Sequence, residues 1–359
     1  MNQRTIIKVF TEDNHSKKKN WVNFLIHPIR AYWGDGTLDW YKYESDFNFY
    51  KSIFIICNDI KNADVAFLPL TLNYYLLNKK LFLVNKFIIQ AKRNNLKTYI
   101  WVEGDYHVRF LTEDLDCTFI RYFSYRSKLI KNEIIMPGDL KTDLLEFHYN
   151  GKFQVKKKSK IPIIGFDGLA KYPLKKFIKL IIKNIFLKLT YNLHFARINQ
   201  DHIIPYLINR EKILINLKNS RLLDTNFNIR NSFAIGTIGK QKELRNQFLN
   251  NIISSDYTFC YRSNANYSLR FYETLCLGRI PLFINTDCKL PFENDIDWKN
   301  LCIWIEESDV KYIPEIILDF HNSHTESQMI DKQVHCREIW LKYLSKKGFY
   351  NHFYKFLPI

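Results

Sequence analysis

The segment Tyr257–Phe283 holds the densest group of residues that can bind an anion. It carries Arg262 and Arg270, whose guanidinium groups can both hold a phosphate through bidentate, charge-assisted hydrogen bonds. Glu273 lies three residues after Arg270 and therefore on the same helical face. A carboxylate there is suited to accept hydrogen bonds from a ribose diol, although an Arg–Glu pair at this spacing is also typical of an ordinary surface ion pair.

The pattern around these residues predicts a strand, a polar turn, a helix and a second strand. We expect a strand over Tyr257–Tyr261, a helix over Tyr267–Leu277 and a strand over Ile280–Ile284. Asn266 or Ser268 can cap the helix, and a glycine follows its end. The free N–H groups at the start of this helix suit a phosphate.

Strands that alternate with helices are expected along the whole chain, which indicates an α/β fold with parallel sheets. The polar, basic stretch Gly151–Lys160 is the best candidate for a boundary between two domains. Other expected strands are Thr5–Phe10, Asp64–Leu68, Thr98–Val102, Thr118–Phe123, Ile161–Phe166 and Cys302–Ile305, and other expected helices are Leu76–Asn94, Leu174–Leu189, Ile203–Lys218 and Lys240–Ile253.

The numbers of charged residues and cysteines exclude some classes of protein and favour others. The 359 residues carry 53 Lys and Arg against 36 Asp and Glu, a net charge of +17, which suits nucleic acid, an anionic membrane or phosphorylated small molecules. Seven scattered cysteines without a C-x-x-C motif exclude a disulfide scaffold and a zinc ribbon, and they favour a reducing, cytoplasmic location. No signal peptide and no membrane-spanning run is expected.

The string Asn266–Pro281, followed by Asp287–Phe292 and Ile296–Trp298, resembles the exostosin family of glycosyltransferases (glycosyltransferase family 47) and its bacterial relatives. The shared pattern is S-x-R-x-x-E, G-x-I-P, D-x-x-x-L-P-F and a later Trp, with Leu282 in place of the usual Val. Ala63–Pro69 looks like the A-D-x-x-x-x-P strand of the family, and the string G-D-Y-H at positions 104–107 is a loose echo of its G-x-D-H.

The resemblance implies a GT-B fold, in which two Rossmann-like domains face each other across a cleft. It divides the chain into an acceptor domain (1–155), a nucleotide-sugar donor domain (160–335) and a helical tail (336–359) that packs back on the first domain. It also implies inverting transfer of a sugar from a nucleotide diphosphate, usually UDP, to a glycan acceptor in surface polysaccharide or lipopolysaccharide synthesis. No metal is expected, and the D-x-D string Asp295–Asp297 is interpreted as a loop feature.

The resemblance and the residue types together suggest roles for individual residues. The general base that inversion requires is sought in the loop after the strand Thr98–Val102, with Asp105 first, then His107 and Glu103; capping or pairing roles remain open for all three. His15 is a further option. Expected donor-binding residues are Arg262, Asn264, Asn266, Tyr267, Ser268, Arg270, Glu273, Arg245 and Gly168. Arg245 can instead be solvated, and Gly168 can belong to an ordinary tight turn.

The stretch Leu174–Leu189 is basic and amphipathic, with Lys176, Lys179 and Lys183 along one face. Such a helix can lie on an anionic bilayer and bring the enzyme to a lipid-linked acceptor. Alternatively, it packs on the second sheet and exposes its lysines. Two other functions stay open, a basic nucleic-acid-binding protein and a non-catalytic glycan-binding protein, although no nucleic-acid motif is present and nucleic acid is not an expected partner.

Overall fold

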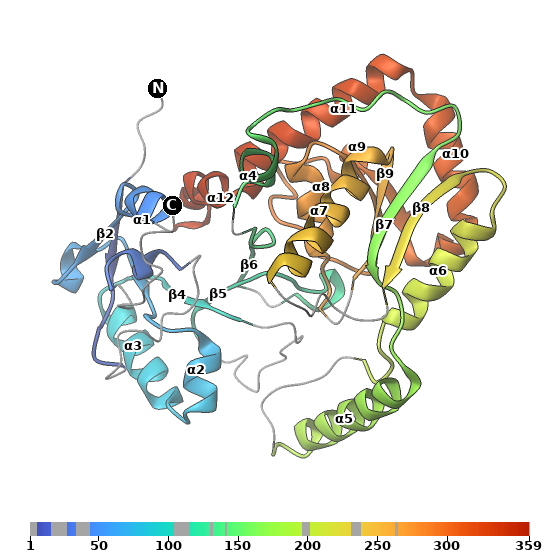
Figure 1. The fold of residues 1–359 in the computed structure, drawn as a ribbon. Coiled ribbons are helices and arrows are strands. Elements are labelled where there is room, and N and C mark those ends of the chain that lie inside the picture. The colour runs from blue at the N-terminus through green and yellow to red at the C-terminus, as the bar shows by residue number, and fades with distance from the viewer. Residues whose placement is uncertain are drawn as a thin grey trace.

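The computed structural model describes residues 6–15, 27–33, 44–103, 115–129, 132–140, 142–195, 202–230, 238–262 and 265–358. These residues form two parallel β-sheets, one in each half of the chain, with helices packed around them (Figure 1). The expected α/β class with two Rossmann-like sheets, the arrangement of the GT-B fold, is confirmed.

The first sheet has the strand order β2-β1-β3-β4-β5-β6, and every pairing in it is parallel. The helices α1 (Glu44–Lys51), α2 (Leu72–Leu77) and α3 (Leu81–Arg93) lie beside this sheet, whereas α4 (Leu144–Tyr149) contacts the second half of the chain. The single helix expected over Leu76–Asn94 is wrong, because Lys79 has a φ of 55° and separates α2 from α3. The strands are β1 (Ile7–Phe10), β2 (Phe54–Cys57), β3 (Val65–Phe67), β4 (Thr98–Trp101), β5 (Thr118–Arg121) and β6 (Glu133–Ile135).

The second sheet has the order β11-β10-β9-β7-β8 and is also parallel throughout. When the strands of each sheet are numbered in chain order, the first five have the doubly wound order 2-1-3-4-5 in both sheets. In the second sheet, the direction in which successive strands are added reverses between β7 and β9. The strands are β7 (Ile163–Leu169), β8 (Asp224–Arg230), β9 (Tyr257–Cys260), β10 (Ile280–Asn285) and β11 (Ile303–Glu306).

Helices cover both faces of the second sheet, as parallel sheets require. α7 (Ile238–Ser254) and α8 (Leu269–Cys276) lie on one face, and α6 (Leu207–Asn219) and α10 (Ile313–Ser323) lie on the other (Figure 1). The short α9 (Trp298–Leu301) and the long α11 (Glu326–Ile339) complete this half.

The last helix, α12 (Lys346–Asn351), contacts the first half of the chain. Lys346 Nζ lies 2.9 Å from the Asp46 carboxylate, and the Tyr99 hydroxyl donates to the Phe356 carbonyl oxygen at 2.7 Å. The Tyr350 ring packs edge-on against Tyr50, with centroids 5.2 Å apart. The segment 346–356 is thereby held against the first half of the chain.

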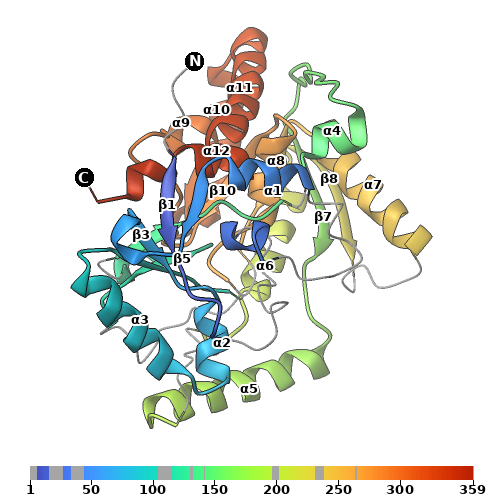
Figure 2. The same ribbon diagram turned by 90° about the vertical axis from the view of Figure 1, so that its left-hand side faces the viewer.

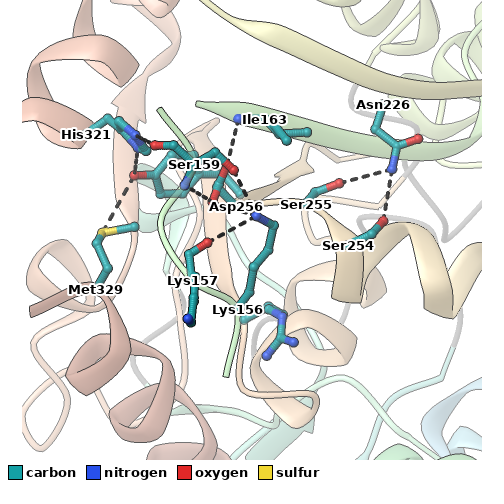
Figure 3. A network of polar contacts seen from close by, with 12 residues as sticks. Lys156, Lys157, Ser159, Ile163, Asn226, Ser254, Ser255, Asp256, His321 and Met329 are labelled. Carbon is teal, nitrogen blue, oxygen red and sulfur yellow. Dashed lines mark hydrogen bonds and ion pairs between the residues drawn. The ribbon is translucent and has the colours of Figure 1, made fainter. Parts of the chain in front are cut away.

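A polar network holds the amino ends of β7 and β9 (Figure 3). Asp256, directly before β9, accepts hydrogen bonds from the backbone of Ser159 and Ile163 and from Lys156 Nζ, at 2.9 to 3.3 Å. His321 bonds the Ser159 carbonyl oxygen and the Tyr257 hydroxyl. This network fixes the end of the sheet opposite the one where the candidate residues lie.

The two halves also meet at the carboxyl ends of their sheets. The residues after β5, which we call the 122–129 segment, lie against the loop after β10. Tyr125 and Cys288 form an antiparallel bridge, the Arg126 N–H donates to the Asp287 carbonyl oxygen at 2.9 Å, and the Lys289 N–H donates to that of Ser124 at 3.2 Å. The carboxyl edges of both sheets are therefore directed toward this contact.

Candidate functional site

The candidate site lies at the carboxyl ends of β7 and β9, where the strand order reverses and where ligands of doubly wound sheets usually bind. α8 begins beside this point. Ser268 occupies its N-cap position, with φ −126° and ψ 115°, but the hydroxyl makes no capping hydrogen bond. The expectation of a strand–turn–helix–strand unit is confirmed, whereas a capping bond from Ser268 is not formed.

Arg270 extends from the first turn of α8 to β7. Its Nη2 donates to the Asp167 carbonyl oxygen at 2.7 Å, and its guanidinium carbon lies 4.4 Å from the centroid of the Phe166 ring. Burial lowers the pKa of Arg270. The guanidinium is thus placed at the reversal point between β7 and β9.

Gly168 makes room for Arg270. A Cβ atom at this position would lie 2.7 Å from Arg270 Nη2, and the φ of Gly168 is 154°. The strand β7 continues to Leu169, so Gly165 and Gly168 lie inside a strand, and the expected strand end at Phe166 is too early. The group that approaches this glycine in the structure is the arginine side chain.

Glu273 pairs with Arg245 of α7. Arg245 Nη1 lies 2.6 Å from Glu273 Oε1, and Glu273 is buried, whereas the Arg245 side chain is 36% exposed. The guanidinium of Arg245 also lies 5.1 Å from the Phe248 ring. The structure therefore brings Arg245, Arg270 and Glu273 to one place from two helices.

Two buried groups beside these residues were missed by sequence reasoning. The Asp167 carboxylate of β7 forms an ion pair with Arg230 Nη2 at the end of β8, at 2.6 Å. Arg210 of α6 donates to the carbonyl oxygens of Leu169, Tyr261 and Arg262 at 2.7 to 3.0 Å, and burial lowers its pKa. Arg210 shares a helical face with the buried Ile213, Leu214 and Leu217. A charged residue on an otherwise apolar helical face indicates a buried charge, and this pattern in the sequence could have identified Arg210.

Arg262 is buried against aromatic rings. Its Nη1 donates to the Tyr125 hydroxyl at 2.6 Å, and its guanidinium carbon lies 3.8 Å from the centroid of the Tyr206 ring. The Tyr125 hydroxyl also bonds His202 Nε2 at 2.6 Å. Arg262, expected to bind the same anion as Arg270, is thus engaged with a tyrosine from the other half of the chain.

Asn266 and Tyr267 also contact the 122–129 segment. The Asn266 side chain donates to the carbonyl oxygens of Ser124 and Asp287, both at 3.3 Å, and accepts from the Thr286 hydroxyl at 2.6 Å. The Tyr267 ring stacks parallel to Phe123, with centroids 5.7 Å apart. Asn264 lies outside the described residues.

Of the three residues expected as a general base, the structure describes Glu103; Asp105 and His107 lie outside the described residues. Glu103 follows β4, and both its backbone N–H and its carbonyl oxygen bond the Asn73 side chain at 2.8 Å. Burial raises the pKa of the Glu103 carboxyl. The Asn73 side chain thus holds the backbone of Glu103 at the carboxyl edge of the first sheet.

His15 follows β1 at the same edge. It is buried between the Tyr75 hydroxyl (2.7 Å from Nδ1) and the Glu12 carboxylate (2.9 Å from Nε2). Burial lowers its pKa. Because both ring nitrogens already have partners, His15 is less suited to take a proton from an acceptor.

The two carboxylates of the D-x-D string have partners within their own loop and tail. Asp297 caps α9 by accepting from the Asn300 N–H at 3.2 Å, and Asp295 forms an ion pair with Lys355. An open hollow of about 710 Å³ adjoins them, and it contains none of the candidate donor-binding residues. Among the described residues, no group of three or more His, Cys, Asp or Glu side chains is arranged to hold a metal ion.

No described helix is both long enough and apolar enough to cross a bilayer. Solved structures that resemble this chain include TarM from S. aureus, in complex with fondaparinux, α-GlcNAc-glycerol and UDP (TM-score 0.37, 12% identity, 81% of this chain and 55% of that chain). Another is the pneumococcal O-GlcNAc transferase GtfA, in complex with UDP and GlcNAc (TM-score 0.33, 10% identity, 81% and 56%).

Sequence comparisons concern one segment of the chain. It is 40% identical over 62 residues to Exostosin-1 from Drosophila melanogaster and 40% identical over 63 residues to the Exostosin-1 homolog from Caenorhabditis elegans. Each match covers 17% of this chain, and they cover 8% and 16% of the relatives. The family model described as the Exostosin GT47 domain matches residues 197–319. The segment that resembles this family lies in the half of the chain that carries the candidate donor-binding residues.

Proposed function

We propose that this chain is an inverting glycosyltransferase that moves a sugar from a UDP-sugar to a glycan acceptor, in surface polysaccharide or lipopolysaccharide synthesis. The observation that carries the proposal is the meeting of Arg245, Arg270 and Glu273 at the reversal point of the second sheet. All three lie within the segment that matches the Exostosin GT47 domain.

In the proposed complex the diphosphate lies at the start of α8. The N–H groups of its first turn and the guanidinium of Arg270 face the anion, and the half-exposed Arg245 closes on it from α7. Glu273 accepts hydrogen bonds from the ribose hydroxyls. Arg262 completes the cationic side when it exchanges its bond to Tyr125 for a phosphate oxygen.

The chemistry is a direct displacement. A base from the first half of the chain takes the proton of an acceptor hydroxyl, whose oxygen forms a bond to the anomeric carbon as the bond from that carbon to the diphosphate breaks. The electron pair leaves with UDP, where arginine side chains and the helix N-terminus stabilise the negative charge. Asp105, His107 and Glu103 are the candidate bases, and the raised pKa of Glu103 suits this role.

A nucleotide-sugar hydrolysis screen tests the proposal. The full chain is incubated with a panel of UDP-, GDP- and other nucleotide sugars, with and without glycan extracts as acceptors, and released nucleotide is measured. We expect release of UDP from one sugar or a few related ones, and acceleration by an acceptor. No release from any donor with acceptors present would refute the proposal, and salt-sensitive binding to RNA or DNA would then favour the nucleic-acid alternative.

A further inference from the structure

Helix α5 (Leu174–Asn192) carries an exposed apolar stripe. Residues spaced by three or four positions lie on one side of a helix, so the members of this stripe form a continuous surface along it. The stripe consists of Leu174, Ile178, Ile182, Ile185, Phe186 and Leu189, each at least 40% exposed.

The opposite side of α5 attaches it to the molecule. Asn184 is buried, and its side-chain amide donates to the carbonyl oxygens of His202 and Ile203 at 3.2 and 3.1 Å. The expectation that the apolar face packs on the second sheet is therefore wrong, because that face points to solvent. α5 lies apart from both sheets, at one end of the molecule (Figures 1 and 2).

The charges of α5 are all of one sign. The helix contains five lysines and no Asp or Glu. Lys175, Lys176, Lys179 and Lys183 are exposed and lie along one border of the apolar stripe, while Lys188 lies near the other. A second copy of this chain would place lysine against lysine, whereas an anionic surface complements both the stripe and its border.

We propose that α5 is an interfacial membrane anchor, with its apolar stripe inserted among the acyl chains of an anionic phospholipid bilayer and its lysines at the headgroup phosphates. A basic amphipathic helix with large apolar side chains binds in this way. The area offered by six large apolar residues and the complementary charge favour a lipid surface as the occupant.

The anchor lies close to the candidate site. α5 follows β7, whose carboxyl end contributes to that site. The Asn184 side chain bonds the backbone of His202, and the His202 ring bonds the Tyr125 hydroxyl. That hydroxyl accepts a hydrogen bond from Arg262. A bilayer under α5 would thus be near the edge at which the two sheets meet. If the chain is a glycosyltransferase as proposed, this geometry suits an acceptor held in the same membrane.

Vesicle co-sedimentation tests the anchor. The full chain is mixed with vesicles of phosphatidylcholine alone or of phosphatidylcholine with phosphatidylglycerol, at low and high salt. We expect binding to the anionic vesicles that weakens as salt screens the lysines. Replacing Lys179 by Gln should weaken binding about fivefold, and replacing Phe186 by Ser on the order of tenfold.

Phe147→Ser is the matched control. Phe147 of α4 is 69% exposed, as Phe186 is 64% exposed, but α4 lies at the opposite end of the molecule (Figure 1). The control should bind vesicles like the unchanged chain, and all variants should keep the same thermal unfolding midpoint. Absence of vesicle binding, equal loss in the control, or an α5-dependent dimer in place of vesicle binding would overturn the proposal. UDP-sugar hydrolysis without vesicles is measured separately, so failure of the anchor is distinguishable from failure of the proposed enzyme.

Discussion

Replacing Glu273 by Gln tests the proposed ribose contact. Glu273 is buried with its Oε1 2.6 Å from Arg245 Nη1, so its carboxylate is held in place before any ligand binds. Hydrogen bonds to a charged group contribute about 1.5–3 kcal/mol each, roughly twice the value for neutral partners. Two ribose bonds that lose the charge of their acceptor should therefore weaken by about 2–3 kcal/mol in total, which corresponds to an affinity for UDP that is roughly 30- to 140-fold lower.

Titration calorimetry with UDP and with 2′-deoxyuridine diphosphate measures this contact. The unchanged chain should prefer UDP by about tenfold, the equivalent of one charge-assisted hydrogen bond, and Glu273→Gln should lose that preference. Glu293→Gln is the matched control, because Glu293 is also a carboxylate paired with an arginine, Arg126, with a side chain only 13% exposed, and it lies outside the site. A Glu273→Gln variant that binds UDP normally and still prefers it to the deoxy compound would refute the assignment.

Four further outcomes are expected. Arg210→Met should lower the free energy of unfolding in urea by about 3–5 kcal/mol, because three carbonyl oxygens lose a buried cationic donor; a smaller change than 1 kcal/mol would contradict this. Gly168→Ala should displace the Arg270 guanidinium and weaken UDP binding about tenfold, and unchanged affinity would mean that this guanidinium does not contact the ligand. Burial lowers the pKa of His27 to about 3, below its unfolded value of 6.5. Below pH 6.5 the unfolded state therefore binds a proton that the folded state does not, and the free energy of unfolding should fall by up to about 1.4 kcal/mol per pH unit. His27→Gln should remove this contribution to the pH dependence of the free energy of unfolding. Burial raises the pKa of Glu103, so a reaction that uses Glu103 as base should slow on acidification at a pH above the ordinary glutamate range. If the rate of the Glu103→Gln variant falls on acidification in the same way, the base is another residue.

The sequence was sufficient to predict the elements with a strong apolar pattern. The unit from Tyr257 to Ile284 could be predicted because two buried strands flank a helix that ends at a glycine. The edge strand β8 was missed because it has no such apolar pattern. β8 (Asp224–Arg230) is polar and contains no buried residue, so it lacks the pattern of a buried strand, although it pairs with β7 along seven residues.

The candidate site was predictable in its residue types but not in its pairings. Glu273 lies three residues from Arg270, yet its ion pair is with Arg245, 28 residues away, because α7 and α8 pack on the same face of the sheet. The partner of Arg262 is Tyr125, 137 residues away. Such contacts depend on how two sheets are placed relative to each other, which local periodicity does not contain.

These pairings have a consequence for ligand binding. Arg270 bonds a carbonyl oxygen of β7, Arg245 bonds Glu273, and Arg262 bonds Tyr125, so a diphosphate that binds through these N–H groups exchanges existing bonds. The exchange at Arg270 and Arg245 takes place within the second half of the chain. The exchange at Arg262 removes a bond between the two halves of the chain. Coupling free energies are reciprocal. An anion that draws Arg262 away from Tyr125 therefore weakens the contact between the halves by the same free energy by which that contact weakens binding of the anion. If the proposed donor draws Arg262 away from Tyr125, its binding and the placement of the 122–129 segment are thermodynamically linked, and the linkage acts at the buried Arg262–Tyr125 bond.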